Sequence, residues 1–338
     1  MDIPITATEL RSRLSQLPRL KLAALPTPLD ELPALSAHLE GPRILAKRED
    51  LTGLAFGGNK IREFEYSIAQ AVEGGYDVLV HGAAAQSNQS RQTAAVAARL
   101  GLKSVIVGRA DAHAHPQGNL LLSHLFGAEV HLPAPEDQAK TLEAIMAELR
   151  TRGHKPFNTS SDAALYRSIA YVDGFLELWE QLQERDIHPD AIYLCSGAHT
   201  HVGLVVGAKA LGLDLRIIGI SPSPRDDDQA ALGLAALAAE NAALLGLNLE
   251  FAPEDLESYG VFAGPAYGVM TDACREALQV MARNEGLVLD PTYTGKTAAG
   301  LIAHIRAGWW NAGQTVVFIH TGGTPALFAY SEELGLDF

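Results

Sequence analysis

The chain has few cysteines and comparatively few positive charges. Two cysteines in 338 residues, Cys195 and Cys274, are too few for a disulfide framework or a structural zinc site, and they are typical of a reducing compartment. The 26 lysines and arginines are outnumbered by 40 aspartates and glutamates, which gives a formal charge of -14. We therefore expect no basic face for nucleic acid or for an anionic membrane, and we predict neither as a partner.

Long hydrophobic runs and targeting signals are also missing. The N-terminal segment has neither the basic region nor the apolar core of a signal peptide. The most apolar stretch, residues 230–249, is interrupted by Glu240 and Asn241, and its helical spacing favours a helix of a soluble protein over a membrane span. We therefore predict a cytoplasmic protein, whose 47% hydrophobic residues suffice for one large core or two smaller ones.

Short β-branched runs alternate with helical segments rich in alanine and leucine along most of the chain. This alternation is typical of parallel strands joined by crossover helices, and it predicts an α/β protein. The predicted strands are residues 44–47, 77–81, 103–108, 191–195, 215–220 and 315–320. The predicted helices are residues 60–73, 89–100, 116–126, 136–150, 167–185, 200–211 and 295–307.

No linker or internal repeat separates two modules, so we expect a second domain to be an insertion. We predict that residues 62–185 form a small α/β domain and that residues 1–61 and 186–338 form a large one. Ligands of such sheets bind beyond the carboxyl ends of the strands. The loops that follow the predicted strands are therefore the places to look for chemistry.

Two nucleotide-binding signatures are absent. No two glycines are separated by a single residue, which excludes the dinucleotide fingerprint, and residues 53–61 imitate a P-loop but end in Asn59, Lys60 and Ile61 instead of Gly-Lys-Ser/Thr. What remains is a lysine behind a glycine pair at a helix start, where an ammonium is disfavoured. Lys60 either points into solvent or is needed there as a near-neutral amine that could form a Schiff base with a carbonyl cofactor.

Two other predicted helices begin directly after buried strands. Ser87 and Asn88 stand at an N-cap position, where they either only cap the helix or leave free N–H groups for a substrate carboxylate. Residues 195–203 either form a plain turn or cradle a phosphate with backbone N–H groups. His199 and His201 have no acidic or cysteine partner at a ligand spacing, so we predict no metal site.

Taken together and in order, six segments resemble the pyridoxal-phosphate-dependent family of 1-aminocyclopropane-1-carboxylate deaminase and D-cysteine desulfhydrase. The resemblance runs from about residue 25 to residue 330. It implies the tryptophan-synthase-β-like fold of type II, with pyridoxal 5'-phosphate between two parallel-sheet α/β domains, and usually a homodimer. The segments are Lys47-Arg48-Glu49-Asp50, Gly57-Gly58-Asn59-Lys60, Gln86-Ser87-Asn88, Gly264-Pro265-Ala266-Tyr267-Gly268, Asp290-Pro291-Thr292-Tyr293-Thr294-Gly295-Lys296 and His320-Thr321-Gly322-Gly323.

The resemblance also implies roles for individual residues. Lys60 matches the Schiff-base lysine, and Asn88 matches a residue that contacts the ring hydroxyl of the cofactor. Ser87 matches the serine beside the substrate, and Gln89 flanks the carboxylate pocket. Taken alone, Tyr267 and Tyr293 would be interpreted as core or rim aromatics. The resemblance instead matches both tyrosines to active-site residues of the family. It also matches a phosphate loop, which consists of Ser196, Gly197, Ala198, His199 and Thr200.

Two threonines predict the branch of the family. Deaminases of the cyclopropane substrate resemble one another in having glutamate in place of Thr294 and leucine in place of Thr321, whereas the desulfhydrase branch has both threonines. A carboxylate near the pyridine nitrogen would keep it protonated and strengthen the electron sink for carbon–carbon cleavage. A threonine leaves a weaker sink, which suffices when a good leaving group is on Cβ. We therefore expect α,β-elimination from D-cysteine, giving pyruvate, sulfide and ammonia, with Thr294 at the substrate and Thr321 at the cofactor.

Three features depart from the family pattern. Thr159-Ser160-Ser161-Asp162 stands where relatives tend to have a Gly-Gly-Ser-Asn turn near the substrate entrance. Arg167 is interpreted as a surface arginine, and the alternative is that it receives an acidic side group of the substrate, which makes L-cysteate, with sulfite leaving, a second candidate. His199 replaces a small residue and could offer the phosphate a charged or hydrogen-bonding side chain.

Other functions stay open at this point. Among enzymes they are D-serine ammonia-lyase, 1-aminocyclopropane-1-carboxylate deaminase and a β-replacement synthase. Outside enzymes, the alternative is an amino-acid-binding protein that has kept the fold. Such a protein needs no lysine at the position of Lys60, which argues for a catalyst.

Overall fold

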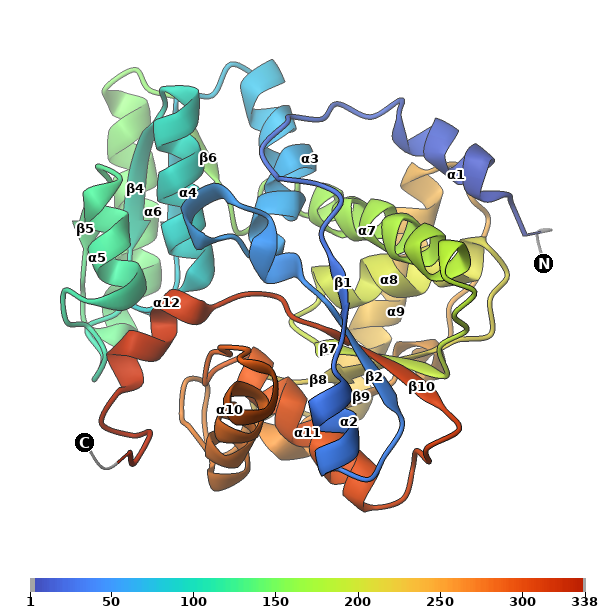
Figure 1. Ribbon diagram of the computed structural model, residues 1–338. Helices are drawn as coiled ribbons and strands as arrows, with labels where there is room; N and C mark the ends of the chain where they lie inside the picture. Colours follow the sequence, from blue (N-terminus) through green and yellow to red (C-terminus); the bar gives the residue numbers. More distant parts are fainter. Residues whose placement is uncertain (1–3, 337–338) are drawn as a thin grey trace.

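The computed structural model describes residues 4–336 and contains two β-sheets with helices packed on them (Figure 1). The larger sheet has the order β1 (Leu29–Glu31), β2 (Arg43–Lys47), β10 (Thr315–Ile319), β7 (Ala191–Cys195), β8 (Arg216–Ile220) and β9 (Ser258–Tyr259). The smaller sheet has the order β5 (Glu129–His131), β4 (Lys103–Val107), β3 (Val78–Gly82) and β6 (Pro156–Asn158). Except for β1, which pairs antiparallel with β2, the strand pairs are parallel. The α/β fold with two parallel-sheet domains is confirmed.

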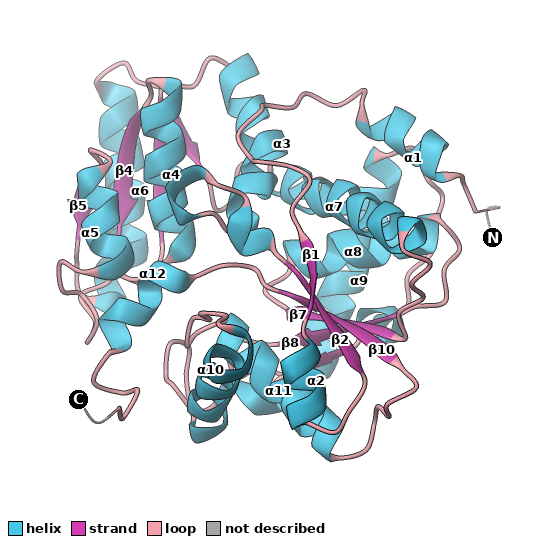
Figure 2. Cartoon of the chain, viewed as in Figure 1, coloured by secondary structure: helices cyan, strands magenta, loops and turns pink. Residues whose placement is uncertain are grey.

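Helices cover both faces of the larger sheet (Figure 2). Successive residues of its strands alternate between two hydrophobic clusters. Leu45 packs toward α7 (Ala164–Glu184) and α8 (His199–Ala210), while Ile44 and Ala46 pack toward α10 (Asp272–Glu285) and α11 (Thr294–Arg306). Burial on both faces explains why these strands have continuous apolar sequences. The helices are α1 Ala7–Leu14, α2 Pro33–His38, α3 Asn59–Glu73, α4 Asn88–Leu100, α5 Gly118–Leu125, α6 Gln138–Thr151, α7 Ala164–Glu184, α8 His199–Ala210, α9 Asp227–Leu244, α10 Asp272–Glu285, α11 Thr294–Arg306 and α12 Thr324–Leu327.

The predicted strands and helices are present, and their ends differ by a few residues. The apolar stretch at residues 230–249 forms α9, which ends at Leu244, and no described helix is long and apolar enough to cross a membrane. Sequence analysis missed β1, β5, β6 and β9, each of two or three residues. Such short strands cannot display a hydrophobic period, and they exist because a longer neighbouring strand offers a pairing edge.

The smaller sheet lies wholly between Val78 and Asn158, inside the segment predicted as the small domain. α7, at the end of that segment, packs instead on α8 and on the core of the larger sheet, with Tyr171 and Phe175 in that core. Toward the C-terminus the chain returns to the smaller sheet, where α12 packs against α5 (Figure 1). The domain limits at 62 and 185 stay a prediction, and residues 1–3 and 337–338 of the predicted large domain lie outside the described residues.

Candidate active site

A cavity of about 460 Å³ lies where loops from the two sheets meet. Its wall includes residues at or just after the carboxyl ends of β3 and β4 in the smaller sheet and of β7 and β10 in the larger one. Ser196 and Thr294 are the two predicted site residues that are not in its wall. The predicted residues that do line it are Lys60, Ser87, Asn88, Gln89, Arg167, Gly197, Ala198, His199, Thr200, Tyr267, Tyr293 and Thr321.

The glycine pair before Lys60 brings the start of α3 to this cavity. Gly57 has a φ of 61°, and a Cβ on it would lie 2.0 Å from the carbonyl oxygen of Asp50, so only glycine fits. Arg91 and Gln92 of α4 both donate hydrogen bonds to the carbonyl of Gly57. The Lys60 side chain lines the cavity, with Nζ 2.7 Å from Glu63 Oε1. The interpretation that Lys60 points into solvent is wrong.

Glu63 is a fully buried carboxylate that pairs with two cations of the site. Its oxygens lie 2.7 Å from Lys60 Nζ and 2.8 Å from Arg167 Nε, and Thr200 donates a hydrogen bond to it. Burial opposes its charge, but the cations outweigh burial and bring the pKa of Glu63 to about 2. Burial lowers the pKa of Lys60, while the Glu63 carboxylate opposes that change. Lys60 is therefore closer to a neutral amine than an exposed lysine would be.

Arg167 is buried, and its interpretation as a surface arginine is wrong. Only 6% of the residue is exposed, because it lies in the first turns of α7, on the side facing the cavity. Besides its ion pair with Glu63, it donates from its terminal nitrogen to Gln89 Oε1 at 2.9 Å. The sequence could not reveal this partner, since 104 residues separate Arg167 from Glu63.

The start of α4 combines a cap with free donors. Ser87 is the N-cap, and its Oγ accepts a hydrogen bond from the Ser90 N–H at 3.2 Å. The side-chain oxygen of Asn88 accepts from Asn119 at 2.7 Å, which fixes the orientation of its amide. Within residues 4–336, the backbone N–H groups of Asn88 and Gln89 have no acceptor. Such donors at a helix N-terminus suit a carboxylate.

The start of α8 also leaves donors free, in this case without a side-chain cap. Ala198 has a φ of 136° at the N-cap position, and the described part of the chain offers no acceptor to the N–H groups of His199 and Thr200. Burial lowers the pKa of His199 to about 3, so its ring is neutral at pH 7 and contributes only hydrogen bonding. Ser196 lies behind the loop, where Arg225 donates to its carbonyl and hydroxyl oxygens at 3.2 Å.

The two predicted active-site tyrosines meet at the cavity. The hydroxyls of Tyr267 and Tyr293 are hydrogen-bonded to each other, and burial raises the pKa of both, so both are protonated at neutral pH. The Thr294 side chain does not line the cavity. Its hydroxyl donates to Asp290 Oδ1 at 2.7 Å and accepts from the Asp290 N–H at 2.8 Å. Of the two branch threonines, only Thr321 lines the cavity.

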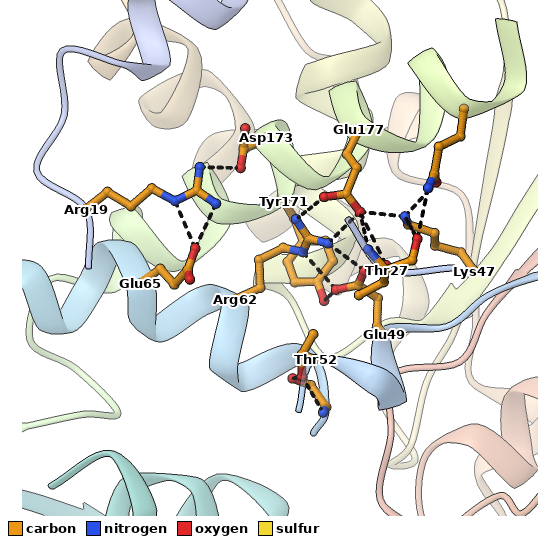
Figure 3. Close-up of polar contacts among 12 residues, drawn as sticks. Arg19, Thr27, Lys47, Glu49, Thr52, Arg62, Glu65, Tyr171, Asp173 and Glu177 are labelled. Atoms are coloured by element: carbon orange, nitrogen blue, oxygen red, sulfur yellow. Dashed lines mark hydrogen bonds and ion pairs between the residues drawn. The ribbon is translucent and has the colours of Figure 1, made fainter. Parts of the chain in front are cut away.

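A buried ionic network behind α3 fixes the helix that carries Lys60 (Figure 3). Arg62, two residues further on, makes two 2.8 Å hydrogen bonds to Glu49 and also binds Glu177 of α7. Tyr171 donates to Glu49, and Lys47 of β2 reaches Glu177. α3 is thereby tied both to the end of β2 and to α7.

Sequence analysis assigned no site role to several residues of the wall. Asn59 belongs to the Gly57-Gly58-Asn59-Lys60 motif and Gln138 begins α6, whereas the others lie at or just after the carboxyl ends of strands, where only that position could have indicated them. Burial lowers the pKa of His81 to about 3, so His81 is neutral, and the Ser160 hydroxyl lies 2.9 Å from its Nδ1. Within residues 4–336, no three or more His, Cys, Asp or Glu side chains gather in an arrangement that could hold a metal ion. The missed residues are Asn59, His81, Ala83, Ala84, Arg109, Gln138 and Cys195.

These residues fit pyridoxal phosphate, the cofactor that the sequence resemblance implies. Lys60 offers a partly desolvated amine, as attachment to a carbonyl requires. The free N–H groups at the start of α8 suit a phosphate, and Arg225 adds a positive charge behind them. Both features open on the same cavity, so one small molecule with an aldehyde and a phosphate can reach both.

Comparison with known proteins supports this assignment. Residues 20–322 match the family model "Pyridoxal-phosphate dependent enzyme". The chain is 40% identical to 1-aminocyclopropane-1-carboxylate deaminase of Variovorax paradoxus (strain S110), over 94% of this chain and 98% of that one. It is 38% identical to D-cysteine desulfhydrase of Salmonella typhi, over 94% and 97%. The crystal structure of an ACC deaminase homologue superposes with a TM-score of 0.87 at 33% identity, covering 96% of this chain and 98% of that chain.

Proposed function

Since the chain belongs to the pyridoxal-phosphate-dependent family of 1-aminocyclopropane-1-carboxylate deaminase and D-cysteine desulfhydrase, we propose that it is a lyase for a small β-substituted amino acid. The reaction is α,β-elimination, in which the amino acid loses its Cα proton and its β-substituent, and one water converts the resulting aminoacrylate to pyruvate and ammonia. The observation that carries the proposal is the meeting of Lys60 and two helix starts with free N–H groups at one cavity.

The residues of the chain divide the work of this reaction. The free N–H groups of Asn88 and Gln89 bind the substrate carboxylate. Lys60 holds the cofactor and afterwards takes the proton from Cα, which the lowered pKa of its amine favours. Bound pyridoxal phosphate supplies the electron sink for the pair left at Cα. Tyr267 and Tyr293 line the cavity and are both protonated, and in this proposal they give a proton to the departing group.

D-Cysteine is the substrate that Thr321 and Thr294 favour, as in the desulfhydrase branch. The Thr294 hydroxyl is hydrogen-bonded to Asp290, whereas Thr321 lines the cavity. The weaker electron sink that a threonine leaves the cofactor therefore depends mainly on Thr321. L-Cysteate is the second candidate, because a sulfonate needs a positive partner and Arg167 lines the cavity, although it also pairs with Glu63. We also propose a homodimer, as in the family, which size-exclusion chromatography with light scattering tests.

Pyruvate release by the cofactor-loaded protein tests the proposal. The panel is D-cysteine, L-cysteine, L-cysteate and D-serine, and 1-aminocyclopropane-1-carboxylate is followed by its own product, 2-oxobutanoate. Lys60→Ala should abolish release, while Lys140→Ala, which changes an exposed lysine, should not. Borohydride reduction should attach the cofactor covalently at Lys60. A protein that binds amino acids without any turnover or covalent adduct would be the binding protein instead.

A further inference from the structure

The charges in the cavity wall are unbalanced. Among residues 4–336, three cationic side chains line it, Lys60, Arg109 and Arg167, and no aspartate or glutamate of that range belongs to its wall. Glu63, just behind the wall, pairs with Lys60 and with Arg167. Arg109 has no ion pair or side-chain hydrogen bond with any residue between 4 and 336, and its Nε is buried without an acceptor. Leaving a guanidinium N–H buried and unpaired is unfavourable, so the site is built for a group that accepts from it.

Arg109 stands where this cavity meets a second one. It follows β4 and also lines an adjoining cavity of about 450 Å³, and Ala84, Arg109 and Tyr267 are the described residues that line both. The adjoining cavity includes neither Lys60 nor any residue of the phosphate loop 196–200. Arg109 therefore borders a space that neither Lys60 nor the phosphate loop lines.

We propose that Arg109 binds the substituent on the β-carbon of the substrate, and that the site takes amino acids whose β-substituent is an anion or leaves as one. The inference rests on the proposed elimination. When the Cβ–S bond breaks, its electron pair departs on sulfur as hydrosulfide from cysteine or as sulfite from cysteate. A guanidinium stabilises either anion with two hydrogen bonds.

Two features of the structure favour Arg109 over its neighbours for this task. Arg167 already gives its Nε to Glu63 and a terminal nitrogen to Gln89, so less of its guanidinium is available. His81 and His199 are neutral, because burial brings the pKa of each to about 3.

Binding without turnover tests the charge recognition directly. Aspartate carries an anionic β-substituent that this elimination does not release, and alanine is its neutral counterpart. Titrating the visible absorbance of the holoenzyme with each ligand gives their dissociation constants. Arg109→Met should weaken aspartate binding about tenfold or more and leave alanine binding unchanged. Arg109→Lys should restore part of the loss, and Arg99→Met, at an exposed arginine of α4, should change neither constant.

Turnover of three substrates then separates this inference from the proposed function. For Arg109→Met, kcat/KM should fall most with cysteate and less with cysteine. It should fall least with β-chloroalanine, because chloride leaves readily without help. If the wild-type protein releases no pyruvate from β-chloroalanine, the proposed elimination itself fails. Two results with an active wild-type protein would overturn the role of Arg109. One is that Arg109→Met changes kcat/KM for the three substrates equally or not at all, and the other is that it weakens alanine binding as much as aspartate binding.

Discussion

Replacing Glu49 by glutamine should destabilise the protein strongly at neutral pH. Glu49 is buried and accepts two hydrogen bonds from Arg62. Burial alone would raise its pKa, but the charge and hydrogen bonds of Arg62, together with Lys47 and Thr27, outweigh burial and bring the pKa of Glu49 from 4.5 to about 2. That difference corresponds to about 3 kcal/mol of folding free energy. Breaking one side of a buried ion pair costs a similar amount, about 3–5 kcal/mol, because the partner charge stays buried. Because Glu177 can still accept hydrogen bonds from Arg62 in the variant, we expect a loss near the lower end of this range.

The pH dependence gives the prediction a second signature. Because the pKa of Glu49 is lower in the folded than in the unfolded protein, its contribution is complete above the unfolded value of 4.5. The contribution is lost as the pH falls from 4.5 toward 2, because Glu49 is protonated over this interval first in the unfolded protein and then in the folded protein as well. The glutamine variant cannot titrate at this position. The difference in unfolding free energy between the two proteins should therefore shrink over that interval.

Equilibrium unfolding in urea at several pH values measures this difference. Glu180→Gln is the matched control, because Glu180 forms an ion pair with Arg11 in which both side chains are 43% or more exposed. Its effect should be less than about 1 kcal/mol. A Glu49→Gln effect as small as that of the control at pH 7, or one that is the same at pH 3 as at pH 7, would refute the assigned role of the network.

Three more variants test other parts of the site. Gly57→Ala should lower the unfolding free energy by more than about 1 kcal/mol, because Gly57 has a positive φ and a Cβ there would meet the carbonyl oxygen of Asp50. Its control, Gly233→Ala, places a Cβ in open space on α9 and should raise the unfolding free energy slightly. Equal effects of the two changes in urea melts would contradict this reasoning. Asn119→Ala frees the amide of Asn88 and should weaken cofactor binding in fluorescence titrations of the apo-protein. Glu63→Gln removes the carboxylate that raises the pKa of Lys60, so the pH profile of its labelling by an amine reagent should move to lower pH, and an unmoved profile argues against the contact.

Local sequence was sufficient to predict the elements that carry the site. The strands that became β2, β3, β7 and β10 are continuous apolar runs, and each is followed by a loop with a chemical task. Lys60 could be singled out because a lysine at a helix start behind two glycines is unusual whatever surrounds it. The order of six motifs then indicated the family, since each motif by itself also fits a turn or a cap.

Long-range contacts escaped prediction for a physical reason. A side chain's partners depend on which strand ends and helix faces meet, and hydrophobic periodicity carries no information on that. Arg167 resembles a surface arginine in its helix, yet α7 turns it toward Glu63 of α3. Thr294 matches a substrate residue by position, but its hydroxyl binds Asp290 four residues earlier. Arg109 follows an ordinary strand, and only the folded structure shows that it lines the cavity and that its buried Nε has no acceptor among residues 4–336.

The sequence by itself determined the fold class, the cofactor family and the positions of most residues that line the cavity, because these follow from apolar periodicity and from short motifs. The tertiary structure decided which of those residues reach the cavity and in which charge state. Burial sets the protonation of Lys60, His81 and His199, and ion pairing sets that of Glu63. Both effects arise only when distant segments pack together and exclude water.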